Sequence, residues 1–178
     1  MKDILNFWYS NRIKNHWFAS TPELDQEILS HYEAVWESAM AGNLDSWRET
    51  GLGALALVLI LDQFPLNMFR GTAKSFSSER KAVEIAWHAV KHNLDAVLEP
   101  QQKAFLYMPF MHSELMAEQD LSVKLYQENQ FAENLKFARH HRDIVKRFGR
   151  FPHRNKILGR ISTEEEKIYL QSPGGYHG

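Results

Sequence analysis

The 178-residue sequence contains no cysteine. Disulfide bonds, thiolate metal ligands and a cysteine nucleophile are therefore excluded, and the composition suits a reducing compartment. The first ten residues, MKDILNFWYS, lack the uninterrupted apolar core that a signal peptide needs. We therefore expect a cytoplasmic protein.

Long apolar runs are also scarce. The most apolar stretch, GLGALALVLIL, covers residues 51–61 and is followed at once by Asp62 and Gln63. Crossing a bilayer takes about 20 apolar residues. The stretch therefore predicts the buried central helix of a protein that does not enter a membrane.

Motifs of several common enzyme classes are missing. The sequence has no G-x-x-x-x-G-K-[ST] or G-x-G-x-x-G loop and no G-x-S-x-G nucleophile elbow. Glu-x-x-His, which marks di-iron helical bundles, does not occur either. His88 and His92 have the spacing of a helical metal chelate, but position 89 is alanine where a zinc protease has glutamate. We predict no cofactor and no metal site.

Helical patterning dominates what is present. Thr21 followed by Pro22 is a typical helix start, and apolar residues then recur every three to four positions as far as Ala39. A second helix is predicted from Asp45 through the apolar stretch, with Pro65 ending it. Other helices are predicted at 77–98, 101–111, after Ser113, at 131–148 and from Thr163 onward.

These patterns predict an all-α protein of about seven to nine helices. Residues 1–171 are expected to form a single compact domain, and the glycine-containing end, residues 172–178, a flexible C-terminal tail. Helix pairs joined by short turns are similar to tetratricopeptide hairpins, although no 34-residue repeat is present.

Positive charge is concentrated in one part of the chain. Residues 136–160 contain nine Lys/Arg and one acid, whereas the whole chain has a net charge of −1. This asymmetry favours either an anionic partner or a fold in which basic and acidic faces meet.

Laid out as a helix, residues 131–148 have one apolar and one charged side. The apolar side carries Phe131, Leu135, Phe137, Ala138, Ile144, Val145 and Phe148. The charged side, predicted to face solvent, carries Lys136, Arg139, His140, Asp143 and Arg147. His141 and Arg142 fall on the apolar side. A buried guanidinium needs a counter-charge, so we expect Arg142 to meet a carboxylate, stacked carbonyls or a bound anion, with Asp62, Gln63 and Glu114 as the candidate partners.

Four segments together are distinctive: DQFPLNMFRG (62–71), FLYMPFMHSE (105–114), HHRDIVKRFGRFPHRN (140–155) and LGRISTEEEKIYL (158–170). In this combination the chain resembles the bacterial domain of unknown function 924 family, over almost its whole length. The resemblance implies a compact α-helical protein with a layout similar to tetratricopeptide folds. It implies no activity.

The leading hypothesis is a polar pocket that binds a small anionic ligand, a carboxylate or a phosphate. A helix start at Pro152, with arginine and histidine beside it, is typical of an anion site. The predicted ligand-binding residues are Arg70, Arg142, Arg150, His153, Arg154 and Asp62. His112 and His141 are the candidates for acid-base chemistry, because histidine titrates near neutrality.

Three alternatives remain open. The same residues fit a purely structural polar network inside a helical protein-interaction scaffold. His112 or His141 fits an uncharacterised hydrolase or lyase. The basic segment 136–160, with phenylalanines interleaved, fits RNA binding, although the acidic remainder of the chain disfavours a nucleic-acid partner.

Overall fold

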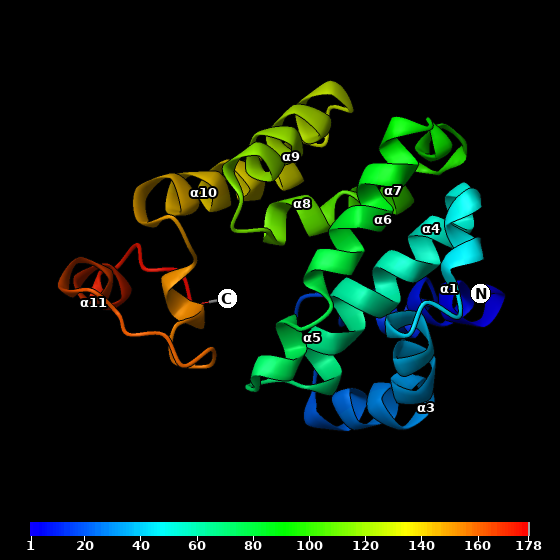
Figure 1. Cartoon of the computed structure of the whole chain (residues 1–178), viewed down its shortest axis with the longest axis horizontal. Helices are drawn as coiled ribbons and strands as arrows, with labels where there is room; N and C mark the ends of the chain where they lie inside the picture. The colour runs from blue at the N-terminus through cyan, green and yellow to red at the C-terminus, as the bar shows by residue number, and fades with distance from the viewer. Residues whose placement is uncertain (178) are drawn as a thin grey trace. The chain divides into compact units, whose positions relative to one another are not determined.

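The structure is a computed structural model that describes residues 1–177 (Figure 1). It confirms the all-α class: 72% of residues 1–177 are helical, and these residues contain no β-strand. The chain divides into two compact units. Unit 1 comprises Met1–Arg70 and Lys74–Pro109, and unit 2 comprises Gly71–Ala73 and the chain from Phe110 onward. The single domain and the tetratricopeptide-like layout stay predictions.

Unit 1 is built from short and medium-length helices. Thr21 caps the longest of them, because its hydroxyl accepts a hydrogen bond from the backbone N–H of Leu24 at 3.3 Å, as predicted. Helix α8 (Met108–His112) carries the chain out of unit 1. The other helices are α1 (Lys2–Trp8), α2 (Asn11–Lys14), α3 (Pro22–Met40), α4 (Gly51–Val58), α5 (Phe64–Met68), α6 (Glu79–Lys91) and α7 (Pro100–Leu106).

The apolar stretch forms the core of unit 1. Helices α4 and α5, with the residues between them, make one helical segment over Gly51–Met68, of which 83% is buried. By length and composition this segment is apolar enough to cross a membrane. The segment is buried against α6 and α7, however, and it is therefore a core helix of unit 1.

The start of α4 differs from the prediction. Asp45–Glu49 forms a separate 3₁₀ turn, and α4 begins at Gly51. A Cβ atom at Gly53 would lie 2.0 Å from the carbonyl oxygen of Trp47. The chain therefore bends tightly between the two helical pieces, and only glycine allows this close approach.

The prediction that Pro65 ends the helix is wrong. Leu59–Gln63 form a π-helical turn, and the N–H of Phe64 bonds to the carbonyl of Leu59 five residues back. Pro65 is the second residue of α5 and has no N–H to donate, and the Leu61 carbonyl four residues before it accepts a hydrogen bond from the Ser78 hydroxyl at 2.6 Å instead. The wider turn thus accommodates the proline, and the helix continues to Met68.

Unit 2 contains α9 (Met116–Glu128), α10 (Ala132–Phe148) and α11 (Glu164–Gln171). Helix α10 packs along α9 after a three-residue turn. Gly149, at φ 71°, ends α10 in the left-handed conformation, as the sequence predicted. A short 3₁₀ turn, Pro152–Arg154, leads on to α11. Ile144, Val145 and Phe151 form a small core there.

One residue that was predicted to lie on the buried, apolar side of α10 is exposed. Phe137 is 58% exposed, whereas Ala138, Ile144 and Val145 are buried. Phe137 and Ile144 lie on the same side of α10, about two turns apart, so the elements that pack on α10 cover this side at Ile144 and leave it open at Phe137. How far the buried stripe extends along the helix therefore depends on the neighbouring elements, which a helical wheel does not contain.

The C-terminal segment folds back onto α11. The N–H of Tyr176 bonds to the Tyr169 hydroxyl at 3.2 Å, and Tyr176 packs against the small core of unit 2. A Cβ at Gly175 would lie 2.6 Å from the Tyr169 carbonyl oxygen, so this return also depends on glycine. The predicted flexibility of residues 172–178 stays a prediction, and residue 178 lies outside the described residues.

Candidate functional site

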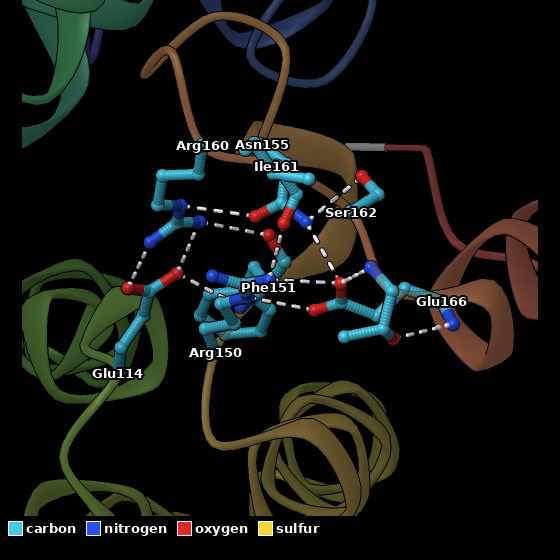
Figure 2. A network of polar contacts seen from close by, with 9 residues as sticks. Glu114, Arg150, Phe151, Asn155, Arg160, Ile161, Ser162 and Glu166 are labelled. Carbon is cyan, nitrogen blue, oxygen red and sulfur yellow. Dashed lines mark hydrogen bonds and ion pairs between the residues drawn. The ribbon is translucent and has the colours of Figure 1, made fainter.

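Unit 2 contains a network of polar contacts around the turn after α10 (Figure 2). The Arg150 guanidinium donates to both carboxylate oxygens of Glu166, with N–O distances of 2.7 and 2.9 Å. The backbone N–H of Thr163 and the side-chain amide of Asn155 also donate to Glu166, at 2.7 and 3.1 Å. These bonds, with Arg150 first, lower the pKa of Glu166 to about 2.

A second ion pair lies beside the first. Arg160 donates to both carboxylate oxygens of Glu114, at 2.6 and 2.9 Å, and the N–H of Phe151 donates to the same carboxylate at 2.8 Å. Burial raises the pKa of Glu114, but the bonds from Arg160 and Phe151 outweigh it and hold the pKa below its usual range. The pair ties the segment before α9 to the turn after α10.

These contacts explain most of the charge concentration in residues 136–160. At least five of the nine Lys/Arg in this segment meet a carboxylate. Four of these carboxylates belong to residues that lie more than one helical turn before or after the segment in the sequence. Basic and acidic surfaces therefore meet within unit 2. The pairs are Lys136 with Glu133, Arg142 with Asp120, Arg147 with Glu165, Arg150 with Glu166, and Arg160 with Glu114.

Two other predicted site residues lie in unit 1. Arg70 donates to Asp25 through Nε and a terminal nitrogen, at 2.6 and 3.1 Å. Asp62 is buried in the π-helical turn and accepts a hydrogen bond from the Gln63 amide at 2.6 Å. The ligand-binding roles of Arg70, Asp62 and Arg150 stay predictions.

The predicted surroundings of Arg142 need correction. Its side chain is 33% exposed, and its Nε donates to Asp120 on α9 at 2.5 Å. A carboxylate meets Arg142 as expected, but the core position and the candidate partners Asp62, Gln63 and Glu114 are wrong. The physical reason is that α9 packs beside α10, so that Asp120 reaches Arg142 from the neighbouring helix.

His141 is buried, with 5% of its surface exposed. Its Nδ1 lies 2.8 Å from the Phe137 carbonyl oxygen, and its Nε2 lies 3.1 Å from the Tyr176 hydroxyl. A carbonyl only accepts, so Nδ1 carries the proton and Nε2 accepts from Tyr176. Burial is the main cause that lowers the pKa of His141 to about 3, and the ring is neutral at pH 7.

His153 and Arg154 lie close to His141 and Tyr176. The His153 ring packs against Tyr176 with the centroids 5.0 Å apart, and Arg154 lies 4.6 Å over the ring of Phe151. Burial and then the charge of Arg154 lower the pKa of His153 to about 4. Its Nδ1 is buried and has no hydrogen-bond partner among residues 1–177.

The electrostatic effect of His112 is another cause that lowers the pKa of His141. The carboxylate of Glu114, two residues after His112, is engaged by Arg160. Tyr176 was missed by sequence reasoning, since a single aromatic residue in a glycine-containing tail has no periodicity. The catalytic roles of His112 and His141 stay predictions.

The surface of α9 and α10 contains a hollow of about 520 Å³. Two of the residues that line it, Arg142 and Asp120, form an ion pair, and Lys124 lies 3.8 Å from Glu128. Arg139 and Asp143 make no ion pair with any residue of the described chain, 1–177. The lining residues are Asp120, Val123, Lys124, Gln127, Glu128, Arg139, Arg142 and Asp143.

Metal-binding geometry is not found in the part of the chain that the structure describes. Residues 1–177 contain no group of three or more His, Asp or Glu side chains placed to hold an ion. His88 and His92 have ring centroids 4.3 Å apart, and Nδ1 of His92 lies 2.8 Å from the His88 carbonyl oxygen. The pair is thus held by its own helix.

Comparison with known proteins identifies relatives of unknown function. The family model described as "Bacterial protein of unknown function (DUF924)" matches residues 4–174. A solved structure of a protein of unknown function from Agrobacterium tumefaciens is 38% identical, with a TM-score of 0.90 over 96% of each chain. No curated protein matches. The match spans nearly the whole chain, and the protein therefore belongs to the bacterial DUF924 family.

Proposed function

We propose that the protein binds a small molecule with a carboxylate or phosphate group in the hollow on α9 and α10. The observation that carries this proposal is Arg139, a guanidinium that lines the hollow and makes no ion pair within residues 1–177. Arg139 and Arg142 contact the anionic group. This keeps the ligand class predicted from the sequence and moves the site to the surface of the helix pair.

The size and donor geometry of the hollow support this role. Small-molecule sites usually measure about 300–1,000 Å³, and the hollow measures about 520 Å³. Arg142 uses its Nε for Asp120, and its terminal nitrogens have no hydrogen-bond partner among the described residues. Two guanidinium groups one helical turn apart provide the paired donors that suit carboxylate and phosphate.

Arg150 and Arg160 receive a structural role in this proposal. Both are held by carboxylates of unit 2 in two-point contacts. For these two residues the network supports the alternative in which the polar residues are structural. That alternative is the second candidate function, a helical interaction scaffold with a structural polar core. Hydrolase or lyase chemistry at His112 or His141, and RNA binding by residues 136–160, stay predictions. The proposed location is the cytoplasm, in keeping with a chain without cysteine.

The test is calorimetric titration with a panel of small carboxylates and phosphates. We expect binding by the wild type and about tenfold weaker binding by Arg139→Gln, the order expected for losing one charge-assisted hydrogen bond. Arg147→Gln is the matched control, because Arg147 lies on the same helix, pairs with Glu165 and does not line the hollow. Binding that is absent from the wild type, or unchanged in Arg139→Gln, contradicts the proposal.

A further inference from the structure

The charges that line the hollow are balanced in number. Three are basic and three are acidic. Asp120 balances the charge of Arg142 through the Nε contact at 2.5 Å but leaves its terminal nitrogens as hydrogen-bond donors, and Lys124 lies 3.8 Å from Glu128. The remaining two are Arg139 and Asp143. The hollow therefore presents one uncommitted charge of each sign.

Arg139 and Asp143 are four residues apart on α10, which places their Cβ atoms about 5–6 Å apart on one face. Opposite charges at this spacing often pair, but the order matters. A base that precedes the acid is the weaker arrangement, and this is the order here. The two side chains form no ion pair with each other, so both remain available to a third molecule.

We infer that the hollow recognises the head group of an α-amino acid, with its carboxylate on Arg139 and its ammonium on Asp143. This inference rests on the proposed function and specifies its ligand class. An α-amino acid carries its ammonium and its carboxylate on the same carbon atom, so that one molecule reaches both partners within one turn of helix. A simple anion leaves Asp143 unmatched beside it.

The lining also limits the side chain of the amino acid. Val123 is the one apolar residue among the eight that line the hollow. A large hydrophobic side chain would find little apolar surface there, since such groups gain affinity by burial. The occupant is therefore an amino acid with a short or polar side chain.

The experiment separates the two charges of the ligand. Glycine, alanine, serine, aspartate, glutamate and glutamine are titrated calorimetrically into the full chain, and each is compared with its N-acetyl derivative, which keeps the carboxylate and lacks the ammonium. We expect the N-acetyl derivative to bind about tenfold more weakly, the order expected for one lost charged hydrogen bond.

Two variants assign the charges to residues. Asp143→Asn should lower the affinity for the amino acid about tenfold and leave that for the N-acetyl derivative unchanged. Arg139→Gln should lower both. Glu133→Gln, an acid on α10 that pairs with Lys136 and lies outside the hollow, is the control. Circular dichroism checks that each variant is folded.

The outcomes distinguish this inference from the proposed function. Equal affinities for amino acid and N-acetyl derivative, with no effect of Asp143→Asn, overturn the inference and leave carboxylate binding at Arg139 in place. Binding that needs the ammonium and Asp143 supports it. If none of these carboxylates binds and the phosphates of the earlier panel do, the inference fails alone. If nothing binds, both fail.

Discussion

Both carboxylate oxygens of Glu166 accept hydrogen bonds from the Arg150 guanidinium, and the two partners differ sharply in exposure. The Glu166 side chain is 2% exposed and that of Arg150 is 27% exposed. A nearly buried charge in α11 therefore depends on a partner that lies closer to the surface. Removing the partner leaves the buried carboxylate without its main counter-charge.

The first prediction follows from this pair. Arg150→Met should lower the free energy of unfolding by about 3 kcal/mol, because breaking a buried ion pair strands the remaining charge. Adding Glu166→Gln should recover part of the loss, since the amide carries no charge. Urea unfolding at pH 7 measures both variants. A loss below about 1 kcal/mol for Arg150→Met, the range of an exposed pair, contradicts a structural role.

Arg142 provides the contrasting case. Its partner Asp120 is 55% exposed, and Arg142 itself is 33% exposed. Arg142→Leu should therefore change the free energy of unfolding by only about 0–1 kcal/mol. Thermal and urea unfolding compare it with Arg150→Met. A large loss would mean that Arg142 supports the fold in a way that its single pair with Asp120 does not explain.

The pH dependence of stability should show the buried imidazole of His141. The folded-state pKa is lowered from 6.5 to about 3. Between these values the unfolded chain binds a proton that the folded chain does not. Stability is therefore complete above about pH 6.5 and falls as the pH decreases towards 3, by up to about 1.4 kcal/mol per pH unit from this group.

Substitution identifies the residue responsible. His141→Gln should show a smaller decrease in unfolding free energy between pH 7 and pH 4 than the wild type, because glutamine does not titrate. His140→Gln is the control, since His140 is the exposed neighbour on the same helix. Urea unfolding at several pH values gives the slopes. Equal slopes for the wild type and His141→Gln would contradict a neutral, buried His141.

The C-terminal return offers a matched pair of glycines. A Cβ at Gly175 would lie 2.6 and 2.8 Å from the carbonyl oxygens of Tyr169 and Leu170, whereas nothing lies within 4 Å of one at Gly174. Gly175→Ala should release Tyr176 from His141, and Gly174→Ala should not. Amide hydrogen exchange at Tyr176, whose N–H bonds to Tyr169, reports the release. Equal protection in the two variants would contradict this packing.

Local signals in the sequence determined the helical class and several helix ends. Thr21 and Thr163 cap helices because their hydroxyl groups bond to backbone N–H groups three residues ahead. Gly149 ends α10 because it adopts a positive φ at little cost. The apolar run from Gly51 is buried because no other part of the chain is as hydrophobic. Each of these effects acts within a few residues.

The tertiary structure decided which groups meet. Asp120, and not Asp62 or Glu114, neutralises Arg142, because the packing of α9 on α10 sets that contact. The same packing creates the hollow and leaves Arg139 available at its wall. Pro65 sits inside a helix because a π turn precedes it. Side chains distant in sequence become neighbours only after helices have packed, so no local pattern contains the partners that define the candidate site.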